Sequence, residues 1–204
     1  MNFPLSYPVK MTFKLLALAP QISVRDAGGA EVLYVRQKLF KLKEEINIFS
    51  DESQSSRIYG IKADRILDWS ARYHFSDDIG RNLGAVKRHG ARSLWKASYD
   101  VLNGDQVEFH IREESAFVRL MDALFGELPI VGLFSGYVFN PVYLAGRAGA
   151  LNEPGALVMR MVKKPSFMER NFYIEKTDPT LTAAEEERLL LSLFMLTLLE
   201  RARG

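Results

Sequence analysis

The segment Leu189-Leu-Leu-Ser-Leu-Phe-Met-Leu-Thr-Leu-Leu199 decides the fold, because as a helix it is apolar in every direction. At 100° per residue, its apolar positions leave no gap wider than about 60° around the axis. A helix that is apolar on every side must be covered on every side. Its apolar part is about 16 Å long, which matches a strand of five or six residues. We therefore predict a many-stranded sheet closed around this helix; the alternative is a helix buried between a sheet and another helix.

The residues that flank this segment predict where the helix begins and ends. Thr182-Ala-Ala-Glu185 fits a capping box, with Thr182 as N-cap. Acidic residues fill the first turn and Arg201 and Arg203 the last, as the helix dipole favours. The helix would be about 20 residues long, but its apolar part is shorter than the ~20 residues that cross a bilayer. The N-terminal apolar run Leu15–Ala19 is likewise too short for a signal peptide, so no cleaved signal is expected.

Short β-compatible segments with turn punctuation fill most of the chain before this helix. Asn103-Gly104 is a two-residue hairpin signal, followed by alternation of apolar residues in Gln106–Arg112. Ala116–Phe125 instead has the spacing of a short amphipathic helix, and Ile130–Ala145 is interpreted as two strands broken at Pro141. No repeat or long linker is present, so residues 1–204 are interpreted as one domain. The other predicted strands are Thr12–Ala19, Gln21–Val24, Glu31–Val35, Lys38–Lys43, Glu45–Phe49, Arg57–Ala63, Ile66–Phe75, Leu83–Lys87, Ser93–Val101, Ala156–Val162 and Phe167–Lys176.

Composition excludes several classes of protein. The 204 residues include no cysteine, so a disulfide scaffold, a cysteine-based zinc site, a cysteine nucleophile and an iron–sulfur protein are excluded. Lys and Arg number 27 against 25 Asp and Glu, a net charge of +2. General nucleic-acid binding needs a stronger basic excess and is not expected.

Catalytic and metal-binding motifs are weak throughout. His74, His89 and His110 are isolated, without the spacing of a metal site. Gly132-Leu-Phe-Ser-Gly136 has its serine displaced by one position from a nucleophile elbow, and no phosphate-binding glycine loop is present. We therefore predict no catalytic residue, no metal site, no cofactor and no enzymatic activity.

Basic residues gather in three places and are the best candidates for a binding site. Several cations that converge on a groove would suit a phosphate group. The alternative is that they form solvated strand faces and protect sheet edges against aggregation. The clusters are Arg36, Lys38, Lys41 and Lys43; then Lys87, Arg88, His89 and Arg92; and finally Lys163 and Lys164.

The order of strands and final helix resembles the tubby C-terminal-like superfamily, which includes tubby proteins and phospholipid scramblases, and most of all its LURP-one-related members. The resemblance rests on three stretches and spans roughly residues 10–203: Ile22-Ser-Val-Arg-Asp-Ala-Gly-Gly29, Val32 to Asp51, and Ile79-Gly-Arg-Asn-Leu-Gly-Ala-Val-Lys-Arg88 with Trp95 and Tyr99. It implies a mainly β fold, a closed antiparallel barrel of about twelve strands around the C-terminal helix, with Ala116–Phe125 as an insertion. The cysteines that scramblases use for lipid anchoring are absent.

The resemblance also implies a binding function. Tubby domains hold a phosphoinositide headgroup with basic residues on early strands, and chain order carries this site onto Arg36, Lys38, Lys41, Lys43 and Arg65. We expect a non-enzymatic, cytoplasmic domain that binds an anionic phospholipid, a membrane surface at its periphery or another phosphorylated ligand. The alternatives are a structural or protein-interaction module that uses the inserted helix Ala116–Phe125, and an enzyme without a recognisable motif.

Overall fold

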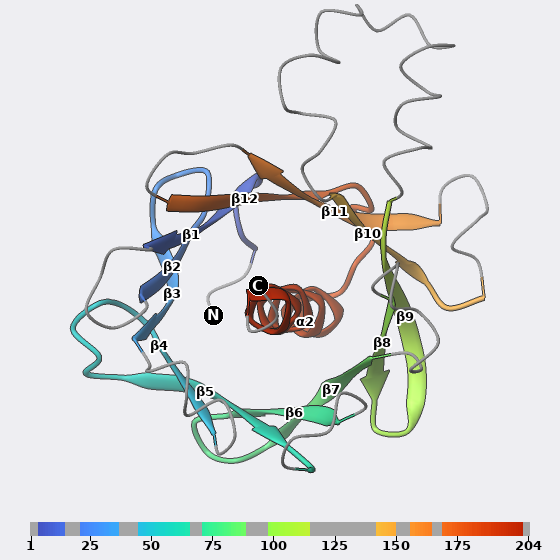
Figure 1. Cartoon of the computed structure of the whole chain (residues 1–204), viewed down its shortest axis with the longest axis horizontal. Coiled ribbons are helices and arrows are strands. Elements are labelled where there is room, and N and C mark those ends of the chain that lie inside the picture. Colours follow the sequence, from blue (N-terminus) through green and yellow to red (C-terminus); the bar gives the residue numbers. More distant parts are fainter. Residues whose placement is uncertain are drawn as a thin grey trace, which may run out of the picture.

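Twelve strands follow one another around a closed sheet, and helix α2 runs through its middle (Figure 1). The computed structural model describes residues 4–14, 21–36, 45–65, 71–88, 98–114, 142–149, 156–164 and 169–201. The strands are β1 (Val9–Lys14), β2 (Gln21–Arg25), β3 (Glu31–Arg36), β4 (Ile46–Phe49), β5 (Arg57–Ala63), β6 (Arg72–Asp77), β7 (Asn82–Arg88), β8 (Ser98–Asn103), β9 (Gln106–Glu113), β10 (Val142–Arg147), β11 (Leu157–Lys164) and β12 (Glu169–Lys176), and α2 is Ala183–Arg201.

Each strand pairs antiparallel with its neighbours in the chain, and β1 closes the barrel against β12 with Met11 opposite Phe172. Side chains alternate between the interior and the outer surface, as the pleat of a strand requires. On β1, for example, Val9, Met11 and Phe13 are buried. The predicted closed barrel is confirmed.

Helix α2 fills the interior, as its apolar circumference predicted. Every residue from Leu189 to Leu198 is buried, including the polar Ser192 and Thr197. Ser192 donates its hydroxyl to the carbonyl of Arg188 at 2.7 Å, and Thr197 donates to that of Phe194 at 2.7 Å. Both hydroxyls are thus satisfied by the helix itself. The alternative of a helix between a sheet and a second helix is not what forms.

Several predicted elements differ at their ends or lie outside the described residues. The hairpin at Asn103-Gly104 is confirmed, with Asn103 opposite Gln106 and Gly104 at a φ of 59°. β1 begins at Val9 rather than Thr12, and β8 continues to Asn103 rather than ending at Val101, because alternation alone does not mark where pairing begins or ends. Residues 66–70 and 93–97, where two further strands are predicted to begin, lie outside the described residues. The second strand predicted within Ile130–Ala145 is β10, whereas Lys38–Lys43 and Ala116–Phe125 lie outside the described residues.

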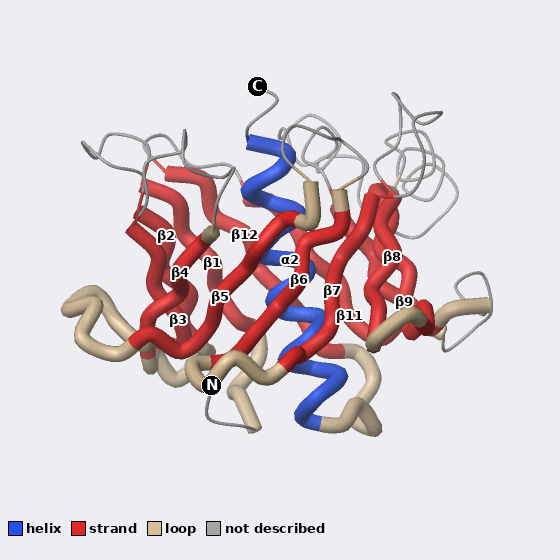
Figure 2. Tube along the Cα trace, turned by 90° about the horizontal axis from the view of Figure 1, so that it is seen from below, coloured by secondary structure: helices blue, strands red, loops and turns tan. Residues whose placement is uncertain are grey.

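The barrel has two different ends (Figure 2). At one, which we call the turn end, α2 begins and the turns at 26–30, 50–56, 78–81 and 104–105 join successive strands. At the other, which we call the rim end, the odd-numbered strands finish and α2 ends. β3 ends at the rim end, and residues 37–44 come directly after it in the sequence and precede β4.

Candidate functional site

Four consecutive charged residues at the start of α2 attach it to the barrel wall at the turn end. The first, Glu185, accepts a hydrogen bond from Arg147 of β10 at 2.8 Å and one from the backbone NH of Thr182 at 2.9 Å. The capping box is thus confirmed. Burial opposes ionisation of Glu185, but the bonds from Arg147 and Thr182 outweigh it and lower its pKa. Arg147 also pairs with Asp178 at 3.3 Å, and hydrogen bonds from Thr180, more than Arg147 itself, lower the pKa of Asp178.

The next two residues contact strands on other sides of the barrel. Glu186 is buried, with an exposed fraction of 2%, and accepts hydrogen bonds from Tyr7 at 2.8 Å and Lys176 at 2.6 Å. Glu187 accepts a hydrogen bond from the hydroxyl of Tyr59 on β5. Burial, and next the bond to its glutamate, raises the pKa of both Tyr7 and Tyr59 well above the usual range. Both phenols therefore stay protonated and continue to donate.

Arg188 is the least exposed cation in the contacts at the start of α2, and its position requires a glycine in the neighbouring strand. Its Nε donates to the carbonyl of Leu83 on β7 at 2.8 Å, and its guanidinium pairs with Glu108 on β9. Gly84 has a φ of +117°, and a Cβ there would lie 2.5 Å from Nε and 2.7 Å from Cδ of Arg188. The missing side chain therefore makes room for Arg188 to enter the wall.

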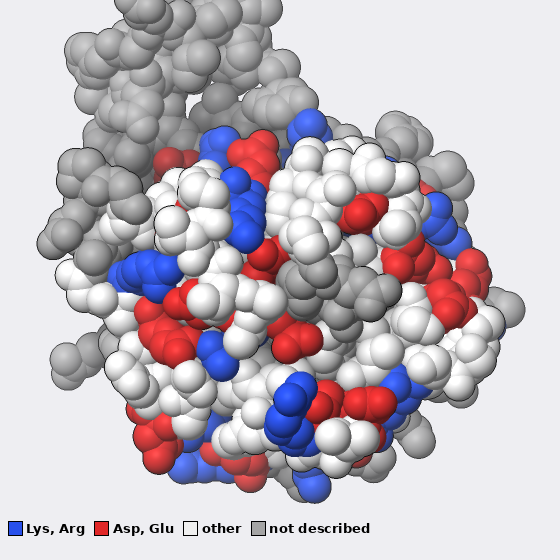
Figure 3. All heavy atoms as spheres, turned by 180° about the vertical axis from the view of Figure 1, so that it is seen from behind, with Lys and Arg blue, Asp and Glu red and all other residues white. Residues whose placement is uncertain are grey.

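These four residues, which we call the collar, are fully occupied by contacts within the chain. On the surface of the turn end, acidic and basic side chains are interspersed (Figure 3). Aspartates there build turns: Asp26 accepts from the NH of Ala30 at 2.9 Å, and Asp51 from that of Ser53 at 2.9 Å. No group of His, Asp and Glu that could hold a metal ion occurs among the described residues. The collar therefore positions α2 in the barrel.

Exposed cations collect at the rim end. β1, β3 and β11 end on Lys14, Arg36 and Lys164, Arg65 lies two residues beyond β5, and Lys87 is the penultimate residue of β7. We call these five exposed residues the basic rim. Within the described ranges, Lys14, Arg36 and Lys87 form no ion pair. Carboxylates are also present, for Glu169 lies opposite Lys14, and Asp64 precedes Arg65.

Two of the five residues predicted to bind a phosphate are described, and strand register separates them. Arg36 and Arg65 are exposed, on β3 and just beyond β5, with β4 between them. The register of the Tyr34–Phe49 pair, continued across β4 to β5, shows which residue of β5 lies level with Arg36. Arg65 lies five residues further along the chain than that residue. The Cα atoms of Arg36 and Arg65 are then about 20 Å apart. Such a spacing suits neighbouring anionic groups on a surface better than one phosphate. Lys38, Lys41 and Lys43 lie outside the described residues.

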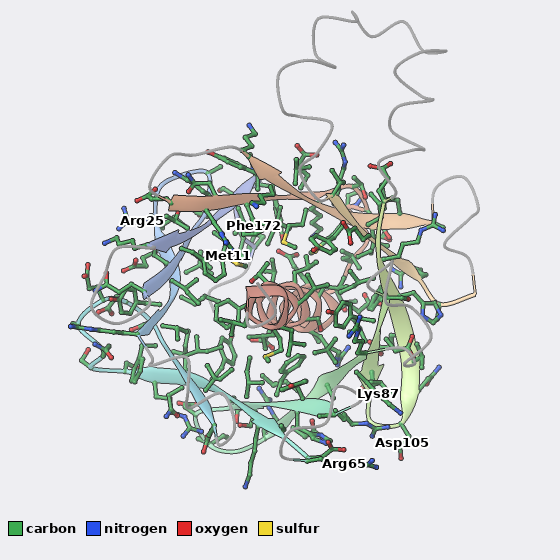
Figure 4. The ribbon with its side chains drawn as sticks, viewed as in Figure 1. Met11, Arg25, Arg65, Lys87, Asp105 and Phe172 are labelled. Atoms are coloured by element: carbon green, nitrogen blue, oxygen red, sulfur yellow. The ribbon has the colours of Figure 1, made fainter. Side chains whose placement is uncertain are left out.

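The other predicted clusters divide between the two faces of the wall. Lys87 points outward and Arg88 is half-buried, while His89 and Arg92 lie outside the described residues. Lys164 is exposed, with Nζ 4.2 Å from the ring centre of Tyr173, whereas Lys163 is half-buried. Figure 4 shows Met11 and Phe172 between the wall and α2, and Arg25, Arg65 and Lys87 at the periphery.

The structure adds partners that sequence reasoning missed. His110 faces outward and its Nδ1 lies 2.8 Å from Oδ1 of Asp100.

Lys14 and Arg170 are single cations in the sequence, so no local pattern singled them out. Their place at the rim end follows only from strand order, which brings β1 and β12 together.

Comparison with known proteins identifies a family. A family model described as LURP-one-related matches residues 31–197, and this family is related to the tubby-like superfamily. No curated protein and no solved structure matches the chain. Among the described residues, no helix has both the length and the apolar character to cross a membrane.

Proposed function

The chain belongs to the LURP-one-related family, and we propose that it binds an anionic phospholipid surface through the basic rim, without catalysis. The observation that carries this proposal is that exposed cations lie at or near the last residues of several strands, all at one end of the barrel. Lys38, Lys41 and Lys43 follow Arg36 in the chain and extend the same basic set.

A surface is favoured over a single headgroup by the spread of these cations. Arg36 and Arg65 are separated by a strand, and Lys14, Lys87 and Lys164 belong to three further strands. Cations at such a rim would each approach a different headgroup when the barrel stands on a membrane. Each basic residue near an anionic surface contributes about 1 kcal/mol, and the attraction is screened by salt.

Absence of catalysis is supported by the filled interior. The side chains of α2 occupy the space where barrels of other kinds hold a ligand, and Leu189 to Leu198 are buried. A reaction site would need a cleft with convergent polar groups. The buried polar groups at the start of α2 are instead bonded to one another and to the wall.

Flotation with vesicles tests the proposal. Vesicles of phosphatidylcholine and phosphatidylglycerol should bind the protein at low salt, and pure phosphatidylcholine should not. Replacing Arg36, Lys38 and Arg65 together by alanine should weaken binding by about 100-fold, from three contributions of about 1 kcal/mol.

The matched control removes the same charge from the turn end. Arg25, Arg57 and Arg81 are exposed arginines, and ion pairs made by exposed side chains contribute little stability. Asp77, the buried partner of Arg81, keeps its hydrogen bond from the backbone NH of residue 81. The triple alanine variant of these arginines should still bind the anionic vesicles. The proposal is wrong if the protein does not bind at low salt, or if both triple variants lose binding equally.

A further inference from the structure

Two cations at the rim end point into the barrel rather than outward. Lys163 lies opposite Phe172 across β11 and β12, and Arg170 lies opposite Phe13 across β12 and β1. Residues directly opposite in an antiparallel pair point to the same face. Because Phe13 and Phe172 are both in the buried core, Lys163 and Arg170 face the interior too.

The two cations are close enough to act on one group. Arg170 is two residues from the partner of Lys163, a diagonal cross-strand position about 7–8 Å away. Directly beneath them Phe13 and Phe172 pack edge to face, with ring centres 5.7 Å apart. Thr197 of α2 contacts Met11, which is opposite Phe172, so the pair lies near the last turn of the helix.

Among the described residues, neither cation is compensated by a neighbouring carboxylate. Both side chains are half-buried, and neither has a carboxylate or hydrogen-bond partner in the part of the chain that the structure describes. Burial, and then the charge of Arg170, lowers the pKa of Lys163. Half-buried like charges side by side are unfavourable unless an anion joins them.

We propose that Lys163 and Arg170 form an inward-facing site for one phosphate monoester group at the rim end. Arginine can donate two parallel hydrogen bonds to phosphate, and lysine adds a compact charge beside it. This site is distinct from the basic rim, whose members point outward. The competing role for the same cations is to complement the C-terminal end of α2, where the helix dipole favours positive charge.

Thermal unfolding with inorganic phosphate separates these roles. At ten times its dissociation constant, phosphate should raise the unfolding midpoint of the full chain by about 3–6 °C beyond a chloride control of equal ionic strength. In Lys163→Met with Arg170→Met this increment should disappear, while the midpoint without phosphate stays equal or rises, because the repulsion is gone. The single variants serve if the double variant does not fold.

Lys164→Met is the matched control, since it removes a cation from the same strand but from the outer face. It should keep the full response to phosphate. Non-specific stabilisation by phosphate would raise all variants alike. An equal response in the Lys163/Arg170 double variant, or no response in the parent protein, would exclude free phosphate as the ligand and leave only a phosphate group carried on a lipid, which the vesicle experiment tests.

A second experiment, vesicle binding, shows whether the phosphate monoester belongs to a lipid. Vesicles of phosphatidylcholine with phosphatidic acid carry the same monoester on a lipid. Binding weakened by the double variant but not by Lys164→Met would assign a lipid headgroup to the site, even if free phosphate binds poorly. An effect of the double variant in neither arm refutes the proposal and leaves binding by the basic rim to its own test.

Discussion

Replacing Gly84 with alanine should destabilise the protein far more than an ordinary surface substitution. The φ of +117° is one that side chains rarely adopt. The new methyl group would also overlap Arg188, and the carbonyl oxygen of Leu102 lies closer still. Arg188 would have to leave the carbonyl of Leu83 and the carboxylate of Glu108, although it is only 6% exposed.

The expected loss in the free energy of unfolding of Gly84→Ala has two parts. A strained backbone conformation costs about 1–3 kcal/mol. Separating the partners of a buried ion pair costs about 3–5 kcal/mol when one charge is left uncompensated. Together they lower the free energy of unfolding by about 4–8 kcal/mol, which is a large part of the ~5–15 kcal/mol typical of a domain.

Urea unfolding of a double-mutant cycle measures it. With a slope of about 3 kcal/mol per molar, Gly84→Ala should lower the midpoint by about 1.3–2.7 M. Arg188→Ala should cost about 3–5 kcal/mol alone, yet the double variant should lose about 3–5 kcal/mol less than the sum, because the ion pair of Arg188 is then lost only once. A loss below about 1 kcal/mol for Gly84→Ala, or strictly additive losses, would refute this account of the glycine.

Two further predictions concern the core helix and its tyrosine contacts. Leu193→Asp should abolish folding, since a charge would be buried without a partner at a cost of several kcal/mol, whereas Leu193→Met should remain folded; circular dichroism and solubility measure this, and a soluble, helical Leu193→Asp protein would contradict a central α2. Since burial raises the pKa of Tyr7 and Tyr59, their contribution to stability is complete below about pH 10 and is lost as the pH rises above it, because the unfolded chain then releases protons that the folded protein keeps. Tyr59→Phe should make the alkaline fall in urea midpoint shallower, and an unchanged pH profile would show that Tyr59 does not contribute to it.

The sequence predicts the barrel because the decisive information is local. The circumference of Leu189–Leu199 and the capping box at Thr182 are each contained within one helix, and together they require a closed cover. Strand order then follows from chain order, because every pair is between neighbours except β1 with β12. Ends of strands were less well predicted, since alternation alone does not show where pairing with a neighbour begins.

The contacts that give each end its character could not be predicted, because they join residues far apart in the chain. Nothing near Gly84 in the sequence shows that Arg188 will pass beside it. Likewise, that Lys163 faces inward and Lys164 outward depends on the register of β11 against β12. A pair of lysines that looks uniform in sequence is thus divided between the two faces of the wall, with different neighbours on each.

The near-neutral net charge of +2 conceals an uneven distribution along the barrel axis. At the turn end, aspartates such as Asp26 and Asp51 hold tight turns, so carboxylates are used in these strand reversals. The positive end of the α2 dipole favours the acidic first turn there, and its negative end favours cations at the rim. The dipole acts only within about one turn, however, and Lys14 and Arg36 lie on the outer face of the wall. Helix electrostatics therefore accounts for inward cations at most, and the exposed basic rim is the part that the proposed binding to an anionic surface would explain.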